Sequence, residues 1–136
     1  MDKKVRFIVI DDDSINNIIC KITIETALGE TDIMTFTDPE AGFDFIEGEF
    51  SGKSANGDLS IMLLDLNMPT MSGWEFLEKF DKLAANIKSR VKIYILSSSV
   101  DDRDRERSYS NKNVTDFIVK PLVLETVLKI ISQTQN

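Results

Sequence analysis

The chain has 136 residues, of which 42% are hydrophobic and 29% charged, and its formal net charge is −7. This length and balance are typical of one globular domain with a hydrophobic core. The acidic charge argues against a nucleic-acid-binding surface, which needs a basic patch, and no apolar run approaches the roughly 20 residues of a membrane helix. We therefore expect a cytoplasmic protein that binds neither nucleic acid nor a membrane.

The sequence contains no histidine and one cysteine, Cys20. Without histidine, any chemistry must rely on carboxylates, lysine, hydroxyl groups and a metal ion. A single cysteine excludes an internal disulfide. Because Cys20 lies among isoleucines, we interpret it as a small buried hydrophobic residue.

Short apolar segments alternate with longer segments of helical spacing. The first, over residues 5–10, is a strand candidate, and Ser14 is expected to cap the helix that follows it. Gly29 can close that helix, whose apolar positions at helical spacing are Ile15, Ile18, Ile19 and Ile22. A weaker strand over 33–37 precedes a second helix, in which Asp38 is the N-cap and Pro39 the first helical residue.

The second half of the chain repeats this alternation. The segment 48–58 is rich in Gly, Ser and Asn and is interpreted as a loop. Strands are predicted over 60–64, 91–96 and 115–119, and a helix follows each of them. The first helix is marked by Trp74, Leu77, Phe80 and Ala84, the second is the highly charged segment 101–110, and the third is marked by Leu124, Val127, Leu128 and Ile131.

Five strand–helix units in a row predict an α/β fold, with a parallel sheet covered by helices on both faces. Strands that are apolar throughout, such as 61–64, suit a sheet that is buried on both sides. The sequence shows no internal repeat and no interdomain linker. Because the last helix takes up the residues after Pro121, we expect a single domain over residues 1–136 without an output domain.

Polar residues stand at the predicted carboxyl ends of four strands, where ligand sites form in open parallel sheets. They are Asp11, Asp12 and Asp13 on the first strand, Asp65 on the third, Ser97 to Ser99 on the fourth, and Lys120 with Pro121 on the fifth. Each alone has an ordinary interpretation, such as a helix cap, a turn residue or a solvated lysine. Their joint occurrence at four strand ends favours a common site.

The expected chemistry of that site follows from its charges. Carboxylates that are gathered at one point repel each other unless a divalent cation neutralises them or one of them takes up a proton. Mg²⁺ prefers oxygen ligands, Lys120 adds a fixed positive charge, and Ser97 offers a hydroxyl. Two acids, a third acid as nucleophile, a lysine and a hydroxyl form a phosphoryl-transfer site of the aspartyl-phosphate type.

Four motifs give this set a family resemblance. They are the hydrophobic run ending in Asp11-Asp12, the block Leu64-Asp65-Leu66-Asn67-Met68-Pro69 followed by Gly73, the segment Leu96-Ser97-Ser98, and the segment Phe117-Ile118-Val119-Lys120-Pro121. Together they resemble the receiver domains of two-component response regulators, of the single-domain, chemotaxis-regulator kind, over nearly the whole chain. The resemblance implies a flavodoxin-like, doubly wound sheet of five parallel strands in the order 2-1-3-4-5.

The resemblance also implies a role for each matching acid. Asp65 matches the acceptor of a phosphoryl group from a phosphohistidine, carried by a histidine kinase or a histidine phosphotransfer protein. Asp11 and Asp12 match the acidic pair that holds Mg²⁺ together with Asp65 and the backbone carbonyl of Asn67. Lys120 matches the lysine that pairs with the phosphate, and its bond to Pro121 is a candidate cis peptide.

Two further residues match the switch of this family. Ser97 matches the hydroxyl residue that moves toward the phosphate, and Phe117 matches the aromatic residue whose rotamer follows it. The surface of helix 101–110, strand 115–119 and the last helix is then expected to bind an unknown downstream protein, unless the phosphate is passed on. The resemblance implies a monomer that is not an enzyme beyond accepting and losing its own phosphoryl group.

Two other interpretations stay open. The segment Ile10-Asp11-Asp12-Asp13 also resembles the D-x-D motif of haloacid-dehalogenase-like phosphatases, with Asp11 as nucleophile and Asp13 as acid/base. That alternative leaves the Asp65 block unexplained. The other is a receiver-like interaction module that is never phosphorylated, although degenerate receivers usually lack one of the acids or the lysine that are present here.

Overall fold

The computed structural model describes residues 5–50 and 59–135 of the chain. The strands are β1 (Val5–Ile10), β2 (Asp32–Phe36), β3 (Leu59–Leu64), β4 (Val91–Ser97) and β5 (Val114–Val119). The helices are α1 (Ser14–Leu28), α2 (Pro39–Phe50), α3 (Gly73–Asp81), α4 (Ala85–Lys88), α5 (Asp102–Tyr109) and α6 (Leu124–Gln135). The predicted alternation is confirmed, and the short helix α4 is an addition to it.

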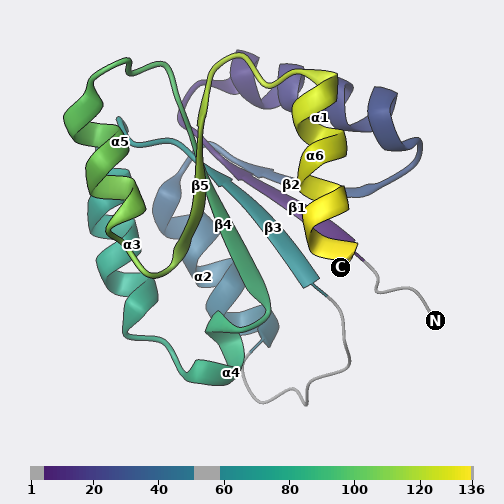
Figure 1. The fold of residues 1–136 in the computed structure, drawn as a ribbon. Coiled ribbons are helices and arrows are strands. Elements are labelled where there is room, and N and C mark those ends of the chain that lie inside the picture. The colour runs from purple at the N-terminus through teal and green to yellow at the C-terminus, as the bar shows by residue number, and fades with distance from the viewer. Residues whose placement is uncertain (1–4, 51–58, 136) are drawn as a thin grey trace.

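The strands form one parallel sheet in the order β2-β1-β3-β4-β5, as predicted. Figure 1 shows α1 and α6 on one face of this sheet and α2, α3 and α5 on the other. The order places β1 and β3 side by side, and the Asp65 N–H donates to the carbonyl oxygen of Ile10 at 3.0 Å. The residues that follow these two strands, Asp11 and Asp65, therefore meet at the same edge of the sheet.

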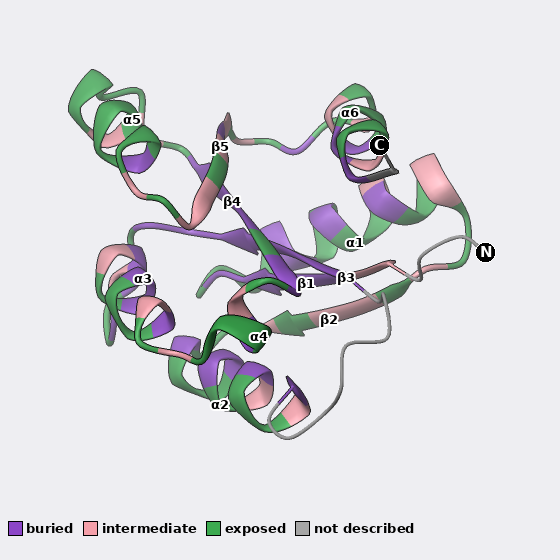
Figure 2. Cartoon of the chain, turned by 60° about the horizontal axis from the view of Figure 1, so that its bottom comes forward, coloured by how far each residue is buried: buried purple, intermediate pink, exposed green. Residues whose placement is uncertain are grey.

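The side chains of the central strands alternate between two apolar cores. One core, against α2 and α3, includes Ile8, Ile10, Met62, Leu64, Ile93 and Ile95. The other core, against α1 and α6, includes Phe7, Val9, Ile61, Leu63, Tyr94 and Leu96. Strands β1, β3 and β4 are therefore largely buried on both faces, as the purple strands in Figure 2 show, whereas the edge strands β2 and β5 are partly exposed.

Helix α1 does not bury the isoleucines whose helical spacing marks it in the sequence. The residues Ile15, Ile18, Ile19 and Ile22 are between 41% and 67% exposed, and the buried residues are Asn16, Asn17, Cys20 and Ile24. The predicted N-cap is also wrong by one residue, because the Asp13 side chain, rather than Ser14, accepts the N–H groups of Ile15 and Asn16. The burial of Cys20 is confirmed.

The other helix ends follow the sequence more closely. Gly29 ends α1 with a φ of +78°, in the left-handed region that glycine adopts without strain. Asp38 caps α2 through the N–H of Glu40 at 3.0 Å. The predicted loop over 48–58 begins later than expected, because α2 continues to Phe50, and its residues 51–58 lie outside the described ranges.

Ala84 does not belong to the helix that begins near Trp74, as was predicted, but immediately precedes α4. Across the described ranges, no helix combines the length and the apolar character needed to cross a membrane.

Candidate functional site

Three carboxylates converge beyond the carboxyl ends of β1 and β3. Asp11 and Asp65 are 2% and 6% exposed, whereas Asp12 is open to solvent. One carboxylate oxygen from each residue lies within 4.8 Å of the other two. Three oxygen donors at this spacing fit a small divalent cation such as Mg²⁺.

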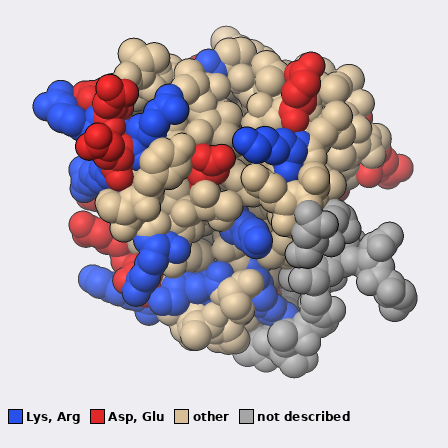
Figure 3. All heavy atoms as spheres, in the orientation of Figure 1, with Lys and Arg blue, Asp and Glu red and all other residues tan. Residues whose placement is uncertain are grey.

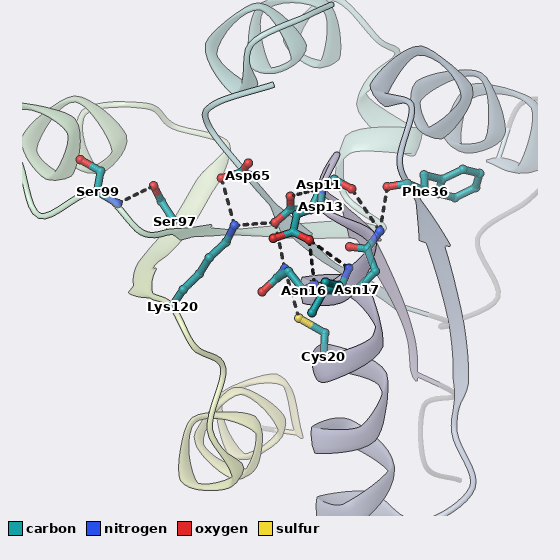
Figure 4. A network of polar contacts seen from close by, with 11 residues as sticks. Asp11, Asp13, Asn16, Asn17, Cys20, Phe36, Asp65, Ser97, Ser99 and Lys120 are labelled. Carbon is teal, nitrogen blue, oxygen red and sulfur yellow. Dashed lines mark hydrogen bonds and ion pairs between the residues drawn. The ribbon is translucent and has the colours of Figure 1, made fainter. Parts of the chain in front are cut away.

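Lys120 reaches this cluster from the end of β5. Its Nζ lies 2.6 Å from Asp11 Oδ2 and 3.6 Å from Asp65 Oδ1, so the ammonium group bridges the two buried acids (Figure 4). Its backbone N–H donates to the carbonyl oxygen of Ser97 at 2.8 Å, and the Lys120–Pro121 peptide is cis, as predicted. Burial by itself would lower the pKa of Lys120, but Asp11 and Asp65 outweigh that effect and raise it.

Asp65 occupies an unfavourable environment for a carboxylate. Burial, and then the negative charge of Asp11, raise the pKa of Asp65 to about 6, although Lys120 and the backbone N–H groups of Leu66 and Asn67 act in the opposite direction. At neutral pH this side chain is therefore mostly ionised, at a cost in free energy that a bound cation would relieve.

Two asparagines of α1 hold Asp11 in place. The Asn16 amide donates to Asp11 Oδ2 at 2.8 Å, and the Asn17 amide donates to the carbonyl oxygens of Asp11 and Phe36 at 3.1 and 3.4 Å. The N–H of Asp13 donates to Asp11 Oδ1 at 2.9 Å. The sequence contained a signal for these residues that we missed, since two consecutive asparagines are unfavourable inside a helix unless their amides have partners.

The carboxylate of Asp13 is committed to the helix. Its Oδ1 accepts the N–H of Ile15 at 3.0 Å and of Asn16 at 3.4 Å, and Asp13 is not one of the three acids whose oxygens converge. It therefore serves as the cap of α1 and lies apart from the three converging acids, which does not favour the phosphatase interpretation.

The two predicted switch residues lie on neighbouring strands. Ser97 ends β4 and is fully buried, and its hydroxyl oxygen accepts the N–H of Ser99 at 3.0 Å. Phe117 lies on β5 opposite Ile95, and its buried ring belongs to the core on the α2 and α3 face. The structure thus brings Ser97 and Phe117 to the same end of the β4–β5 pair.

Gly73 packs closely against the backbone of Asp65 and Leu66. A Cβ at Gly73 would stand 2.5 Å from the carbonyl oxygen of Asp65 and 2.9 Å from Leu66 Cα, which are backbone atoms that cannot turn away. We expect Gly73→Ala to lower the free energy of unfolding by about 2 kcal/mol, as overpacking does, and to displace Asp65. Denaturant unfolding measures the first effect.

The matched control is Gly48→Ala, on α2, where an added Cβ meets no atom within 4 Å. That change is expected to be neutral or to stabilise by about 0.5–1 kcal/mol, because alanine favours a helix over glycine. A similar loss of unfolding free energy in both variants would show that the close packing of Gly73 against the Asp65 backbone is not the reason that this position requires glycine.

Comparison with known proteins decides the family. The model of the response regulator receiver domain matches residues 7–132. The chain belongs to this family. A response regulator receiver protein from Dyadobacter fermentans has the same fold, with a TM-score of 0.84, 24% sequence identity, and coverage of 96% of this chain and 97% of that one.

Two curated relatives are longer than the matched region. The "Probable methanogenesis regulatory protein FilR2" of Methanothrix harundinacea is 28% identical over 100 residues, which are 73% of this chain and 61% of that protein. The cyclic di-GMP phosphodiesterase response regulator RpfG of Xanthomonas campestris is 26% identical over 121 residues, which are 89% of this chain and 29% of that protein. The chain therefore spans less than two thirds of either relative.

As a receiver domain, the chain belongs to two-component signal transduction, and its family is one of signalling domains that are generally not enzymes. The three acids whose oxygens converge in the structure are Asp11, Asp12 and Asp65. All three belong to the receiver motifs of the sequence.

Proposed function

We propose that this receiver domain accepts a phosphoryl group on Asp65 from a phosphohistidine of a histidine kinase or a histidine phosphotransfer protein. The observation that supports this proposal is the convergence of Asp65 with two further carboxylates and the Lys120 ammonium group at one edge of the sheet. An Asp65 oxygen attacks the phosphorus atom, the new O–P bond forms, and the N–P bond breaks with its electron pair going to the imidazole. Lys120 neutralises part of the charge on the transferred group.

We infer that Asp11, Asp12, Asp65 and the backbone carbonyl of Asn67 hold Mg²⁺. When bound, the cation would neutralise charge on the phosphoryl oxygens. Both oxygens of Asp11 already accept protein hydrogen bonds, from Asp13 N–H on one side and from Asn16 and Lys120 on the other. Asp12 and Asp65 therefore offer the direct ligands, and Asp11 acts through water.

The signal leaves through the surface formed by α5, β5 and α6. In this proposal the Ser97 hydroxyl turns toward the phosphoryl group, Phe117 fills the space behind it, and the altered surface binds a downstream protein, or the phosphate is passed to another histidine. The monomeric state and the cytoplasmic location stay predictions.

The phosphodonor docks on α1, beside the site. The exposed face of Ile15, Ile18, Ile19 and Ile22 begins two residues after Asp13 and forms one apolar stripe. Exposed apolar patches of this kind mark protein interfaces. A protein that presents its phosphohistidine to Asp65 must cover the mouth of the site, and the start of α1 lies there.

Replacing Ile18 and Ile22 together by serine is expected to slow phosphoryl transfer from the protein donor about tenfold or more. The reason is that the two serines bury less apolar surface against the donor than the two isoleucines do. Phosphorylation by a small acyl phosphate should not change, because that donor needs no apolar surface. Rates with the two donors, measured on the same variant, give the comparison. Equal slowing with both donors would place the defect in the site instead of the docking surface.

Incubation with a small acyl phosphate, with and without Mg²⁺, tests the function itself. We expect the intact mass to increase by one phosphoryl group only when Mg²⁺ is present. An unchanged mass would favour the interaction module that is never phosphorylated. Turnover of a generic phosphate ester that is lost in Asp11→Asn and kept in Asp65→Asn would support the phosphatase alternative.

A further inference from the structure

Helix α5 has almost no apolar residues to hold it on the domain. Its sequence is DRDRERSY, only Ser108 is buried, and charged side chains of both signs gather over it on the left of Figure 3. The Arg105 guanidinium lies 5.2 Å from the ring centre of Phe117, and that of Arg107 lies 4.2 Å from the ring of Trp74. Such contacts are weak at exposed sites, and an element with few buried contacts is typically a low-stability, movable part of a fold.

One chain of hydrogen bonds joins the first turn of α5 to Ser97. The Ser99 N–H donates to Ser97 Oγ at 3.0 Å, as Figure 4 shows, and the Ser99 hydroxyl donates to Asp104 Oδ2 at 2.8 Å. The Asp101 N–H donates to the Ser99 hydroxyl oxygen at 3.2 Å. Ser99 is thus held on one side by the start of α5 and is bonded on the other side to Ser97.

We propose that Asp104 is a positioning residue that holds Ser97 in its resting orientation through Ser99. This inference rests on the proposed phosphorylation of Asp65. Its neighbour on the helix, Arg105, contacts the ring of Phe117. Two consecutive residues of α5 therefore contact, directly or through Ser99, both of the residues proposed to switch.

The hydrogen bond from the Ser99 N–H to Ser97 Oγ decides whether Asp104 favours the unphosphorylated or the phosphorylated state. When the Ser97 hydroxyl turns toward a phosphoryl group on Asp65, it leaves the Ser99 N–H without its acceptor. Asp104 holds Ser99 in the position from which the Ser99 N–H reaches Ser97 Oγ. It therefore stabilises the unphosphorylated arrangement. A contact that stabilises one of two states lowers the affinity of any ligand that requires the other. Removing Asp104 should therefore favour the phosphorylated state.

The probe is beryllium trifluoride, a stable mimic of the phosphoryl group, added with Mg²⁺. Asp104→Ala is expected to bind it about five- to tenfold more tightly than the wild type, the amount expected from one ordinary hydrogen bond. The control is Asp102→Ala, which removes an exposed carboxylate from the same turn and should leave the affinity unchanged. Mg²⁺ affinity without the mimic should be equal in all variants, because Asp104 is not one of the converging acids.

Ser99→Ala supplies the second measurement. Because Asp104 acts through Ser99, this variant should bind the mimic more tightly as well, and adding Asp104→Ala to it should have no further effect. If Asp104→Ala does not fold, Asp104→Asn replaces it. The amide keeps an acceptor oxygen but loses the charge, so a gain of about two- to threefold is expected.

Equal affinities in Asp104→Ala and Asp102→Ala would overturn the inference, and so would additive effects of Ser99→Ala and Asp104→Ala. If the wild type binds the mimic and only the variants fail to differ, the proposed phosphorylation stands without the role of Asp104. If the wild type itself does not bind the mimic, the proposed phosphorylation of Asp65 fails and this inference fails with it.

Discussion

Replacing Lys120 by methionine is expected to lower the free energy of unfolding by about 3 kcal/mol when divalent cations are absent, as the breaking of buried ion pairs does. Methionine keeps most of the alkyl stem but removes the charge that lies 2.6 Å from Asp11 and 3.6 Å from Asp65. Asp11 is 2% exposed and would be left as a buried carboxylate without its cation. Denaturant unfolding in the presence of a chelator measures the loss.

Adding Mg²⁺ to this variant is expected to recover most of the lost stability, because the ion neutralises the same carboxylates and stabilises the folded state that binds it. Lys112→Met is the control, since that lysine is 75% exposed and lies 3.5 Å from Asp81. An exposed pair of this kind contributes little. Equal losses in the two variants, or no recovery with Mg²⁺, would contradict the electrostatic account of the site.

Replacing Asp65 by asparagine is expected to stabilise the metal-free protein at pH 8 by about 2–3 kcal/mol. Burial and the charge of Asp11 raise the pKa of Asp65 to about 6 in the folded protein, whereas the unfolded chain titrates near its ordinary value of about 4. The proton on Asp65 therefore stabilises the fold fully below about pH 4, and this contribution is lost as the pH rises through about 6. Asparagine has no such proton to lose.

Urea unfolding between pH 4 and pH 8, with a chelator present, measures this difference. The gap between Asp65→Asn and the wild type should be small at pH 4 and should widen until the pH passes about 6, where it levels off. Asp44→Asn, at an exposed position on α2, is the control for the substitution itself. A gap that stays constant from pH 4 to pH 8 would mean that the burial of Asp65 does not cost stability.

The sheet could be predicted from sequence because its central strands are largely apolar. Segments such as Ile61 to Leu64 suit a sheet that is covered on both faces, and the polar residues after the strands mark their carboxyl ends. Those ends lie together in any parallel sheet. The convergence of Asp11, Asp65 and Lys120 was therefore predictable before any contact was known, and the structure bears it out.

The orientation of α1 could not be predicted in the same way. The helix has one stripe with Ile18 and Ile22 and another with Cys20 and Ile24, and both have helical spacing. Hydrophobicity alone favours the isoleucine stripe. The observed choice depends on a tertiary contact, because Asn16 and Asn17 face the sheet and bond to Asp11.

Two further features depend on contacts that the sequence pattern does not show. Helix α2 continues past Gly48 to Phe50, whose buried ring packs against the guanidinium of Arg90, 5.3 Å away and forty positions along the chain. The charged segment of α5 resembles a solvated helix in sequence, and the bond from Ser99 to Asp104 depends on the path of the loop between them. Neither contact leaves a periodic signal in the sequence.

The central claim, that Asp65 is the phosphoacceptor, is tested most directly by mass spectrometry of the wild type and Asp65→Asn after incubation with a small acyl phosphate and Mg²⁺. The account predicts that the wild type gains one phosphoryl group, located by fragmentation on the peptide that contains Asp65, and that Asp65→Asn gains none. A phosphoryl group on Asp65→Asn, mapped to Asp11 or Asp13, would contradict it.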